Sequence, residues 1–446
     1  MHRSYPLRPL RLSLTCAAAV AFLCGASWAL PASAAPDPAD AARLFAEARE
    51  ICERDHGTLW GRSLCGPMLL VDYTDRAVLA NEADTGGKLT RAGALFRGVL
   101  PDEVIIANTP TEWSGTRWTQ IVGPAPTDTE KRHVLLAHEM FHRVQPTLGL
   151  TRPEMGNRHL DTLEGRYLLQ LEWRALARAL EAKTPEDHRL AVADALAFRH
   201  ERYRLFADAA KEEGALETNE GIAEYTGVAL GLTTDHDRTA YAVYDLSAFV
   251  SAPTFVRSFA YATGPAFGLM LDQADPAWRG KLGSGLRFDE LLGNALKFRV
   301  SADDTLAPRT ARYDDGTLRK TEVRRDEERQ TRLAAFKARL VDGPVLSLPL
   351  KNSNYQFNPQ TLIPLEGFGT IYPGMRLTDD WGSLEVERDG ALVRDKPPMA
   401  TVSAVGANPA GTAGDGWQLK LDPGWKVQPG ERAGDLVVTR TENSPR

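Results

Sequence analysis

The most constraining feature of the sequence is the segment HEMFH at residues 138–142, which lies inside a strongly signalled helix. Thr127 and Glu130 form a capping-box pattern ahead of this segment, and Pro146 marks its end. Apolar residues recur between these limits and predict a surface that a core must cover: Val134, Leu135, Leu136, Met140, Phe141 and Val144. Because residues four apart share one face of a helix, the imidazoles of His138 and His142 must point the same way.

Two imidazoles on one helical face are typical of a zinc site. Neutral His138 and His142 can bind one zinc ion together, and Glu139 lies beside them. Zinc lowers the pKa of a bound water to about 7, so a neighbouring carboxylate can accept its proton as a general base, and such chemistry hydrolyses amides. We therefore expect Zn²⁺ as the cofactor, with His138 and His142 as ligands and Glu139 as the general base. The alternative is a surface helix with two unrelated histidines.

A second, acidic motif at residues 217–225 (ETNEGIAEY) offers a third protein ligand, which two helical histidines leave missing. A catalytic zinc site usually has three protein ligands and one open position for water. Glu220 and Glu224 are four apart on a predicted helix, so one can bind the metal while the other hydrogen-bonds a ligating imidazole. The alternative is an acidic helix face exposed to solvent.

Together, HEMFH and NEGIAEY resemble the motifs of the gluzincin branch of the zincin metallopeptidases, the thermolysin-like and aminopeptidase-like clan. In that clan the HExxH histidines and a glutamate from an N-E-x-x-x-[D/E] helix bind zinc. The resemblance covers two short segments and implies a set of roles: His138, His142 and Glu220 as ligands, Glu139 as base, Glu224 bound to a ligand, and Asn219 in support. The metzincin pattern does not fit, because Gln145 and Leu148 stand where it needs a glycine and a third histidine.

The interval between the two motifs departs from the well-known gluzincins, in which it is much shorter. Here residues 143–219 intervene, which is 77 residues. The usual spacing points nearer to Glu164, the alternative third ligand, but Glu164 lacks the preceding asparagine and the acid four residues later that Glu220 has. If Glu220 is the ligand, the helices predicted over 160–213 are an insertion that walls or roofs the cleft and restricts which substrates enter.

A group that stabilises the oxyanion of the tetrahedral intermediate would complete such a site. Related clan members often use a tyrosine or histidine downstream of the third ligand. Tyr261, just before a predicted helix start, is therefore the candidate, with a core aromatic as the alternative; Tyr225 and His236, the latter in a polar loop, are secondary candidates. By analogy with the clan, residues 117–123 (RWTQIVG) are expected to be an edge strand that binds the substrate backbone.

Residues 1–34 have the pattern of a secretory signal peptide. Arg3, Arg8 and Arg11 precede an apolar run from Leu12, and Ala32-Ser33-Ala34 offers a cleavage site. The alternatives are an uncleaved membrane anchor and a lipoprotein, but polar residues interrupt the run and neither cysteine in it follows a small residue. We expect an exported protein, periplasmic or extracellular, with no stable membrane insertion after cleavage.

Export changes both the charge and the cysteine count. Without residues 1–34 the chain has 50 Lys and Arg against 59 Asp and Glu, a formal net charge of −9. A chain this acidic has no general attraction for nucleic acid or anionic lipid, so no nucleic acid is expected as a partner. Cys52 and Cys65 remain as an even pair in an oxidising compartment, and we expect a disulfide between them.

The hydrophobic pattern predicts an α+β fold in four parts after the signal peptide. Residues 35–158 combine a small sheet with the HExxH helix, with strands at 68–71, 94–100, 104–107 and 117–123. Residues 159–315 form a large helical subdomain that carries the third ligand, with helices at about 160–183, 186–213 and from Asn219. Residues 316–342 form a charged helix or linker, and residues 343–446 a β-rich region. The resemblance implies a zincin-like catalytic region in the first two parts.

We therefore expect an exported zinc metallopeptidase that hydrolyses a peptide or protein substrate. Two alternatives stay open: a non-catalytic exported binding or assembly protein with a structural or vestigial zinc site, and a zinc hydrolase that acts on a non-peptide amide. A structural zinc usually has four protein ligands. The sequence offers three and an adjacent glutamate, which favours catalysis.

Overall fold

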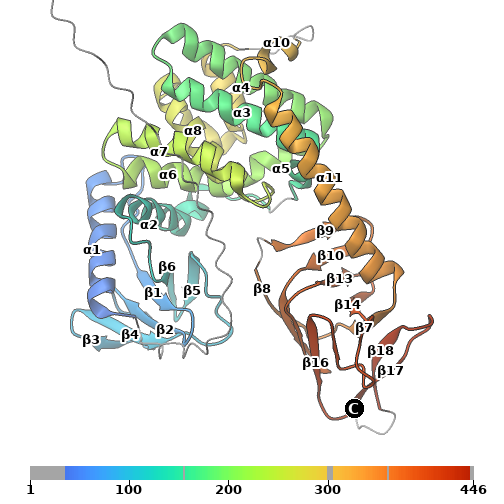
Figure 1. Ribbon diagram of the computed structural model, residues 1–446. Coiled ribbons are helices and arrows are strands. Elements are labelled where there is room, and N and C mark those ends of the chain that lie inside the picture. Colours follow the sequence, from blue (N-terminus) through green and yellow to red (C-terminus); the bar gives the residue numbers. More distant parts are fainter. Residues whose placement is uncertain (1–35, 154–155, 299–304, 359–360, 442–446) are drawn as a thin grey trace, which may run out of the picture.

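The computed structural model describes residues 36–153, 156–298, 305–358 and 361–441. The fold mixes helices and strands, so the α+β prediction is confirmed at the level of class. A small sheet with α1 and α2 comes first, a block of helices follows, and α11 joins that block to a β-rich part (Figure 1). The predicted signal peptide lies outside the described residues.

The N-terminal sheet has six strands in the order β3-β4-β2-β1-β6-β5, with β1 and β6 parallel and the other neighbours antiparallel. Their bounds are β1 (Met68–Asp72), β2 (Ala77–Ala80), β3 (Thr90–Ala92), β4 (Leu95–Val99), β5 (Thr109–Trp113) and β6 (Thr116–Gly123). Because side chains alternate along a strand, Leu70 and Ile121 face the core under α1 (Pro38–Asp55) and α2 (Thr129–Val144), whereas Leu69 and Trp118 face the other side. The sheet thus gives α2 a rigid base.

Two predictions about strands in this part are wrong. Residues 104–107 form no strand; instead, the carbonyls of Ile105 and Ala107 accept hydrogen bonds from the buried Gln120 side chain. Residues 117–123 do form a strand, but β6 lies between β1 and β5, so it is β5 that forms this edge of the sheet. The turn at Ser114 and Gly115, both with positive φ, folds β5 back onto β6.

The start of α2 also differs from the prediction. Its N-cap is Asp128, whose side chain accepts a hydrogen bond from the Lys131 N–H at 2.9 Å. Thr127 and Glu130 therefore do not form the predicted capping box. Asp at this position does the same work for the free N–H groups of the first turn.

The predicted disulfide is present between Cys52, in α1, and Cys65, with Cα atoms 5.3 Å apart. The carbonyls of Leu64 and Cys65 both accept hydrogen bonds from Arg143, which follows the HEMFH segment in α2. The disulfide-closed loop is therefore fastened to α2. Among the helices of the described residues, none is both long enough and apolar enough to span a membrane.

The helical block packs around α2, α6 and α8. Its helices are α3 (Leu163–Glu181), α4 (Pro185–Leu205), α5 (Ala209–Leu216), α6 (Ile222–Gly231), α7 (Asp235–Ala248), α8 (Phe259–Ala274) and α9 (Phe288–Ala295). A π-turn, Glu217–Gly221, joins α5 to α6 without a break. The helix predicted at 186–213 is interrupted, because Phe206 adopts an extended conformation at the C-cap of α4. One hydrophobic core runs from α1 to α9, so the predicted parts 35–158 and 159–315 share it.

A buried ion network holds the π-turn to the helical block. Arg199 of α4 binds Glu217 through both terminal nitrogens, at 2.9 and 2.6 Å, and Glu172 through Nε at 2.8 Å. Arg202 binds Glu213 at 2.7 and 2.6 Å and Glu172 at 2.7 Å. All five side chains are at most 2% exposed. A charge buried this deeply needs an opposite partner, and each one here has at least one.

The β-rich part follows α11 (Thr317–Lys337), which is the predicted charged helix. Near the start of α11, Glu322 binds Arg166 and Gln170 of α3, and near its end Phe336 packs beside Ile371. Two sheets follow, with orders β17-β18-β7-β14-β13-β10-β9 and β15-β16-β12-β11-β8, and they share a core. Their strands are β7 (Val345–Pro349), β8 (Asn354–Phe357), β9 (Ile363–Leu365), β10 (Gly369–Tyr372), β11 (Met375–Asp379), β12 (Gly382–Val386), β13 (Ala391–Asp395), β14 (Pro398–Ser403), β15 (Ala413–Gly414), β16 (Trp417–Leu421), β17 (Trp425–Pro429) and β18 (Leu436–Arg440).

The Arg202–Glu213 pair makes stability depend on pH. Burial raises the pKa of Glu213, but Arg202, His159 and Arg199 outweigh burial and lower that pKa to about 2. A carboxyl with a lowered folded-state pKa stabilises the fold fully above its unfolded pKa of 4.5, and this contribution is lost as pH falls towards 2. We expect Glu213→Gln to lower the free energy of unfolding at pH 7 by about 3–5 kcal/mol, because Arg202 loses its main counter-charge.

The difference between parent and variant should shrink by about 2 kcal/mol between pH 7 and about pH 3, because below pH 4.5 the Glu213 carboxyl of the unfolded chain takes up a proton while the folded-state carboxyl, with its pKa of about 2, stays mostly ionised. Urea unfolding at the two pH values measures it. A difference that stays constant across this range would show that the charge of Glu213 does not stabilise the fold.

Candidate metal centre

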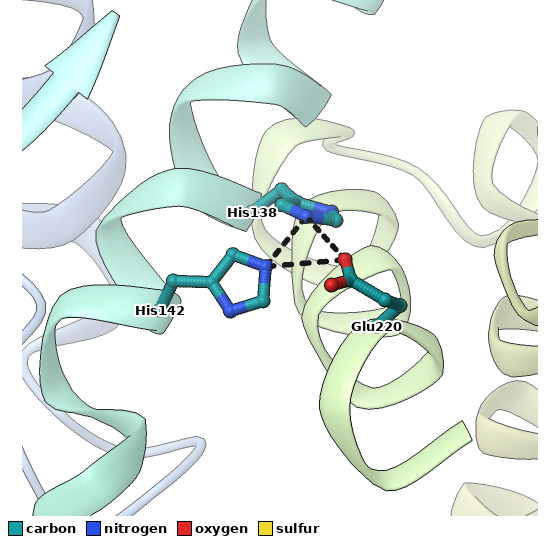
Figure 2. Close-up of side chains that lie close together, drawn as sticks. All are labelled: His138, His142 and Glu220. Carbon is teal, nitrogen blue, oxygen red and sulfur yellow. Dashed lines mark hydrogen bonds and ion pairs between the residues drawn. The ribbon is translucent and has the colours of Figure 1, made fainter. Parts of the chain in front are cut away.

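Two helices bring three potential ligand atoms to one point. His138 and His142 lie on one face of α2, and Glu220 lies in the π-turn Glu217–Gly221 (Figure 2). The two imidazole Nε2 atoms are 2.9 Å apart. Glu220 Oε2 lies 3.6 Å from the Nε2 of His138 and 3.4 Å from that of His142. Within the described part of the chain, this is the one group of three His, Cys, Asp or Glu residues placed to hold a metal ion.

Hydrogen bonds fix which nitrogen of each imidazole faces this point. Glu224 Oε2 lies 2.7 Å from His138 Nδ1, and Gln145 Oε1 lies 2.7 Å from His142 Nδ1. Carboxylate and amide oxygens only accept hydrogen bonds, so both Nδ1 atoms carry the proton. In the neutral imidazoles, each Nε2 then presents a lone pair towards Glu220.

Two lone pairs at 2.9 Å repel each other unless positive charge lies between or beside them. Burial lowers the pKa of His138, but its hydrogen bonds to Glu220 and Glu224 outweigh burial and raise that pKa well above its ordinary value. Burial raises the pKa of Glu220, but hydrogen bonds from His138 and His142 outweigh it and hold the pKa far below its usual range. The site therefore attracts a cation, whether a proton or a metal ion.

The three atoms fit a zinc ion. Tetrahedral zinc at about 2.0–2.2 Å from nitrogen and oxygen ligands holds those ligands about 3.3 Å apart. The observed separations run from 2.9 to 3.6 Å and bracket this value. Imidazole nitrogen and carboxylate oxygen are ordinary zinc ligands, and three of them leave one position open. The residues present could thus hold Zn²⁺ without a rearrangement of the helices.

Glu139, the residue after His138 in α2, has one carboxylate oxygen without a hydrogen-bond partner among the described residues. That oxygen is Oε2, and the Glu139 side chain is 5% exposed. Burial raises its pKa, while the nearby imidazoles of His138 and His142 oppose that rise. A buried carboxylate oxygen without a partner is costly, so its presence points to a ligand that it receives. Glu139 Oε2 is thus able to accept a hydrogen bond or a proton from a bound molecule.

Tyr261 contacts two of the three candidate ligands, Glu220 and His138. It is in the first turn of α8, and its hydroxyl donates to Glu220 Oε2 at 2.7 Å. Its ring stacks on His138 with centroids 5.6 Å apart and planes within 4°. Burial, and next the charge of Glu220, raise the pKa of Tyr261, so the hydroxyl keeps its proton. Tyr261 is therefore a neutral donor next to the candidate metal position.

The other residues considered from the sequence lie elsewhere or do other work. Glu164 binds Arg319 of α11, with one contact at 2.8 Å, and is not among the ligand atoms. Tyr225 is buried and donates to Asp272 at 2.8 Å. His236 is exposed in the first turn of α7, whose N-cap is Thr234, so its predicted loop position is wrong.

Asn219, which the resemblance places in support of the site, lies in the π-turn and bonds the backbone of Arg152. Its Oδ1 accepts from the backbone N–H of Arg152 at 2.8 Å, and its Nδ2 donates to the Arg152 carbonyl at 2.9 Å. This double hydrogen bond joins the turn to the segment that follows η1 (Gln145–Leu148). The residues predicted as an insertion also support the turn, through the Arg199–Glu217 pair.

Two supporting positions were missed in the sequence. Gln145 counted only as a mismatch to the metzincin pattern, although it follows His142 by three residues, a spacing that places the two side chains on one face of a helix. A Cβ on Gly264 would lie 2.1 Å from the carbonyl oxygen of Gly221, so α8 and the π-turn cross backbone to backbone. The Gly264-Pro265 pair inside an apolar helical stretch is a signal that could have found this crossing, because a glycine there usually has a packing reason.

The site as a whole combines three converging ligand atoms, a carboxylate without a partner and a neutral hydroxyl donor. Such a set can bind a cation, accept a proton and donate a hydrogen bond within a few ångströms. Comparisons of the chain with protein-family models, with curated proteins and with solved structures gave no match.

The backbone crossing predicts that Gly264→Ala is damaging. A new methyl group would overpack the contact with Gly221, which costs about 1–3 kcal/mol, and each kcal/mol lowers the Tm of a chain this large by about 2–4 °C. Gly280→Ala is the matched control, since no atom lies within 4 Å of a Cβ there. Thermal unfolding followed by circular dichroism measures both. Equal Tm values for the two variants would mean that α8 and the π-turn can separate without cost.

Proposed function

We propose that this chain is an exported, zinc-dependent metallopeptidase with a gluzincin-type site. The observation that carries the proposal is the pair of Nε2 lone pairs that face each other and Glu220, with both Nδ1 protons held by acceptors. A protein without a bound cation gains nothing from two neutral imidazoles in this geometry. The unpartnered Oε2 of Glu139 beside them supports hydrolysis over a structural role.

When bound, zinc would polarise a substrate carbonyl and make a water molecule more acidic. With zinc held by His138, His142 and Glu220, Glu139 would serve as the general base through Oε2, the carboxylate oxygen that has no hydrogen-bond partner among the described residues. Glu224 and Gln145 hold the ligating imidazoles in the tautomer that binds metal. The Tyr261 hydroxyl turns from Glu220 to the oxygen of the scissile carbonyl and stabilises the charge that develops there.

The placement of β5 supports a peptide as the substrate. β5 is one of the two edge strands of the N-terminal sheet and packs beside α2. An edge strand has free backbone groups that can pair with an extended peptide. In the proposal β5, rather than β6, therefore takes the role of the substrate-binding strand in a zincin-like catalytic region.

Export is part of the proposal for two reasons. Residues 1–34 carry a secretory pattern in the sequence. The Cys52–Cys65 disulfide suits an oxidising compartment such as the periplasm or the extracellular space.

The first test is zinc per chain, measured by elemental analysis of residues 35–446. We expect about one zinc in the parent, as for a site of three protein ligands. Glu220→Gln should lose it, whereas Glu164→Gln should keep it, because Glu164 binds Arg319 instead. No zinc in the folded parent after incubation with excess metal would end the metallopeptidase proposal and favour a non-catalytic binding protein.

The second test distinguishes a catalytic zinc site from a structural one. Glu139→Gln should keep zinc but slow the hydrolysis of a peptide library by about 10²–10⁴-fold, the usual contribution of a general base. A zinc-loaded parent that cleaves no peptide but cleaves simple amides would favour the non-peptide hydrolase. A parent that binds zinc and cleaves neither would favour a structural site.

A further inference from the structure

Both the oxygen and the nitrogen of the Gln145 side-chain amide form hydrogen bonds, one to α2 and the other to the π-turn. It is the C-cap residue of α2 and is 3% exposed. Its Oε1 lies 2.7 Å from His142 Nδ1. Its Nε2 donates to the carbonyl oxygens of Thr218 and Asn219 at 2.9 and 3.0 Å. One side chain thus touches a candidate ligand on α2 and the backbone of the π-turn that carries Glu220.

These contacts leave the amide only one orientation. Backbone carbonyls accept hydrogen bonds and never donate them, so the end of Gln145 that faces Thr218 and Asn219 must be the NH₂ group. The amide oxygen must then face His142, and it can only accept. His142 therefore carries its proton on Nδ1 and presents a lone pair at Nε2, the atom that faces His138 and Glu220. The π-turn carbonyls decide the tautomer of His142 through Gln145.

The π-turn carries two carboxylates, Glu217 and Glu220, that must point to different partners, and Gln145 helps to hold it in that conformation. On a regular α-helix, residues three apart lie on one face. Glu217 and Glu220 are three apart, yet Glu217 binds Arg199 of α4 and Glu220 faces the histidines of α2. The wider π-turn lets the two carboxylates diverge to these different partners. Gln145 binds two consecutive carbonyls of this turn and so holds Glu220 towards α2.

We infer that Gln145 is the positioning residue that couples the two helices of the metal centre, by fixing the His142 tautomer through its oxygen and the Glu220 turn through its nitrogen. The inference rests on the proposed zinc site and extends it. Partners that orient metal ligands typically change metal affinity by 10–100-fold when removed. Gln145 serves a histidine and a carboxylate ligand together, so its loss should reach the upper part of that range.

The test compares Gln145→Met with Gln120→Met. Gln120 is a matched control because it is fully buried and also donates from Nε2 to two backbone carbonyls, those of Ile105 and Ala107. Competition with a chelator gives the zinc Kd, and ¹⁵N NMR of the histidine rings in metal-free protein reports the tautomers. We expect Gln145→Met to weaken zinc binding by roughly 10–100-fold and to give His142 a mixture of tautomers. Gln120→Met should lower Tm but leave both readouts unchanged.

Gln145→Glu separates the two contacts. It keeps an oxygen acceptor for His142 but loses the donor to Thr218 and Asn219. We expect it to restore the single His142 tautomer while zinc binding stays weaker than in the parent. The inference is overturned if Gln145→Met binds zinc as tightly as the parent, or if Gln120→Met loses as much affinity. A parent that binds no zinc would instead overturn the proposed function itself.

Discussion

The approach of two imidazole Nε2 atoms to 2.9 Å is the contact on which the rest of this site depends. In neutral rings with protonated Nδ1 atoms, it sets two lone pairs against each other, and a carboxylate oxygen lies within 3.6 Å of both. Only a positive charge makes that arrangement favourable. The surrounding side chains act in the same sense: Glu224 and Gln145 accept from the outer nitrogens, and the inner nitrogens are left free for the cation.

The scaffold keeps these groups together by contacts that involve backbone and buried charge. Gly264 lets α8 cross directly against Gly221, so Tyr261 and Glu220 come from touching elements. On the other side of the π-turn, Arg199 neutralises Glu217. Two carboxylates three residues apart thus have separate partners, Arg199 in the helical block for Glu217 and the histidines of α2 for Glu220. Their mutual repulsion is offset by different partners, which keeps Glu220 available for a ligand.

The sequence could predict those features of the fold and the site that depend on residues close together in the chain. The two histidines share a face because of helical geometry alone, and Glu220 follows from a short motif on one helix. The disulfide followed from counting the cysteines that remain after a predicted signal peptide. The edge strand was misplaced because strand order is set by pairing across the sheet, and Pro110 within β5 weakens its strand pattern. Gln145 was missed because its role depends on two carbonyls 73 and 74 residues away.

The pair formed by Arg199 and Glu217 gives the long stretch between the two motifs a structural role. A carboxylate that is 2% exposed needs a cation nearby, and here that cation comes from α4, inside the intervening residues. Deleting those helices to reach a shorter spacing would strand a buried charge one turn from the metal centre. In evolutionary terms, a descendant that lost α4 would also need a substitution at Glu217. The two changes would therefore be inherited together.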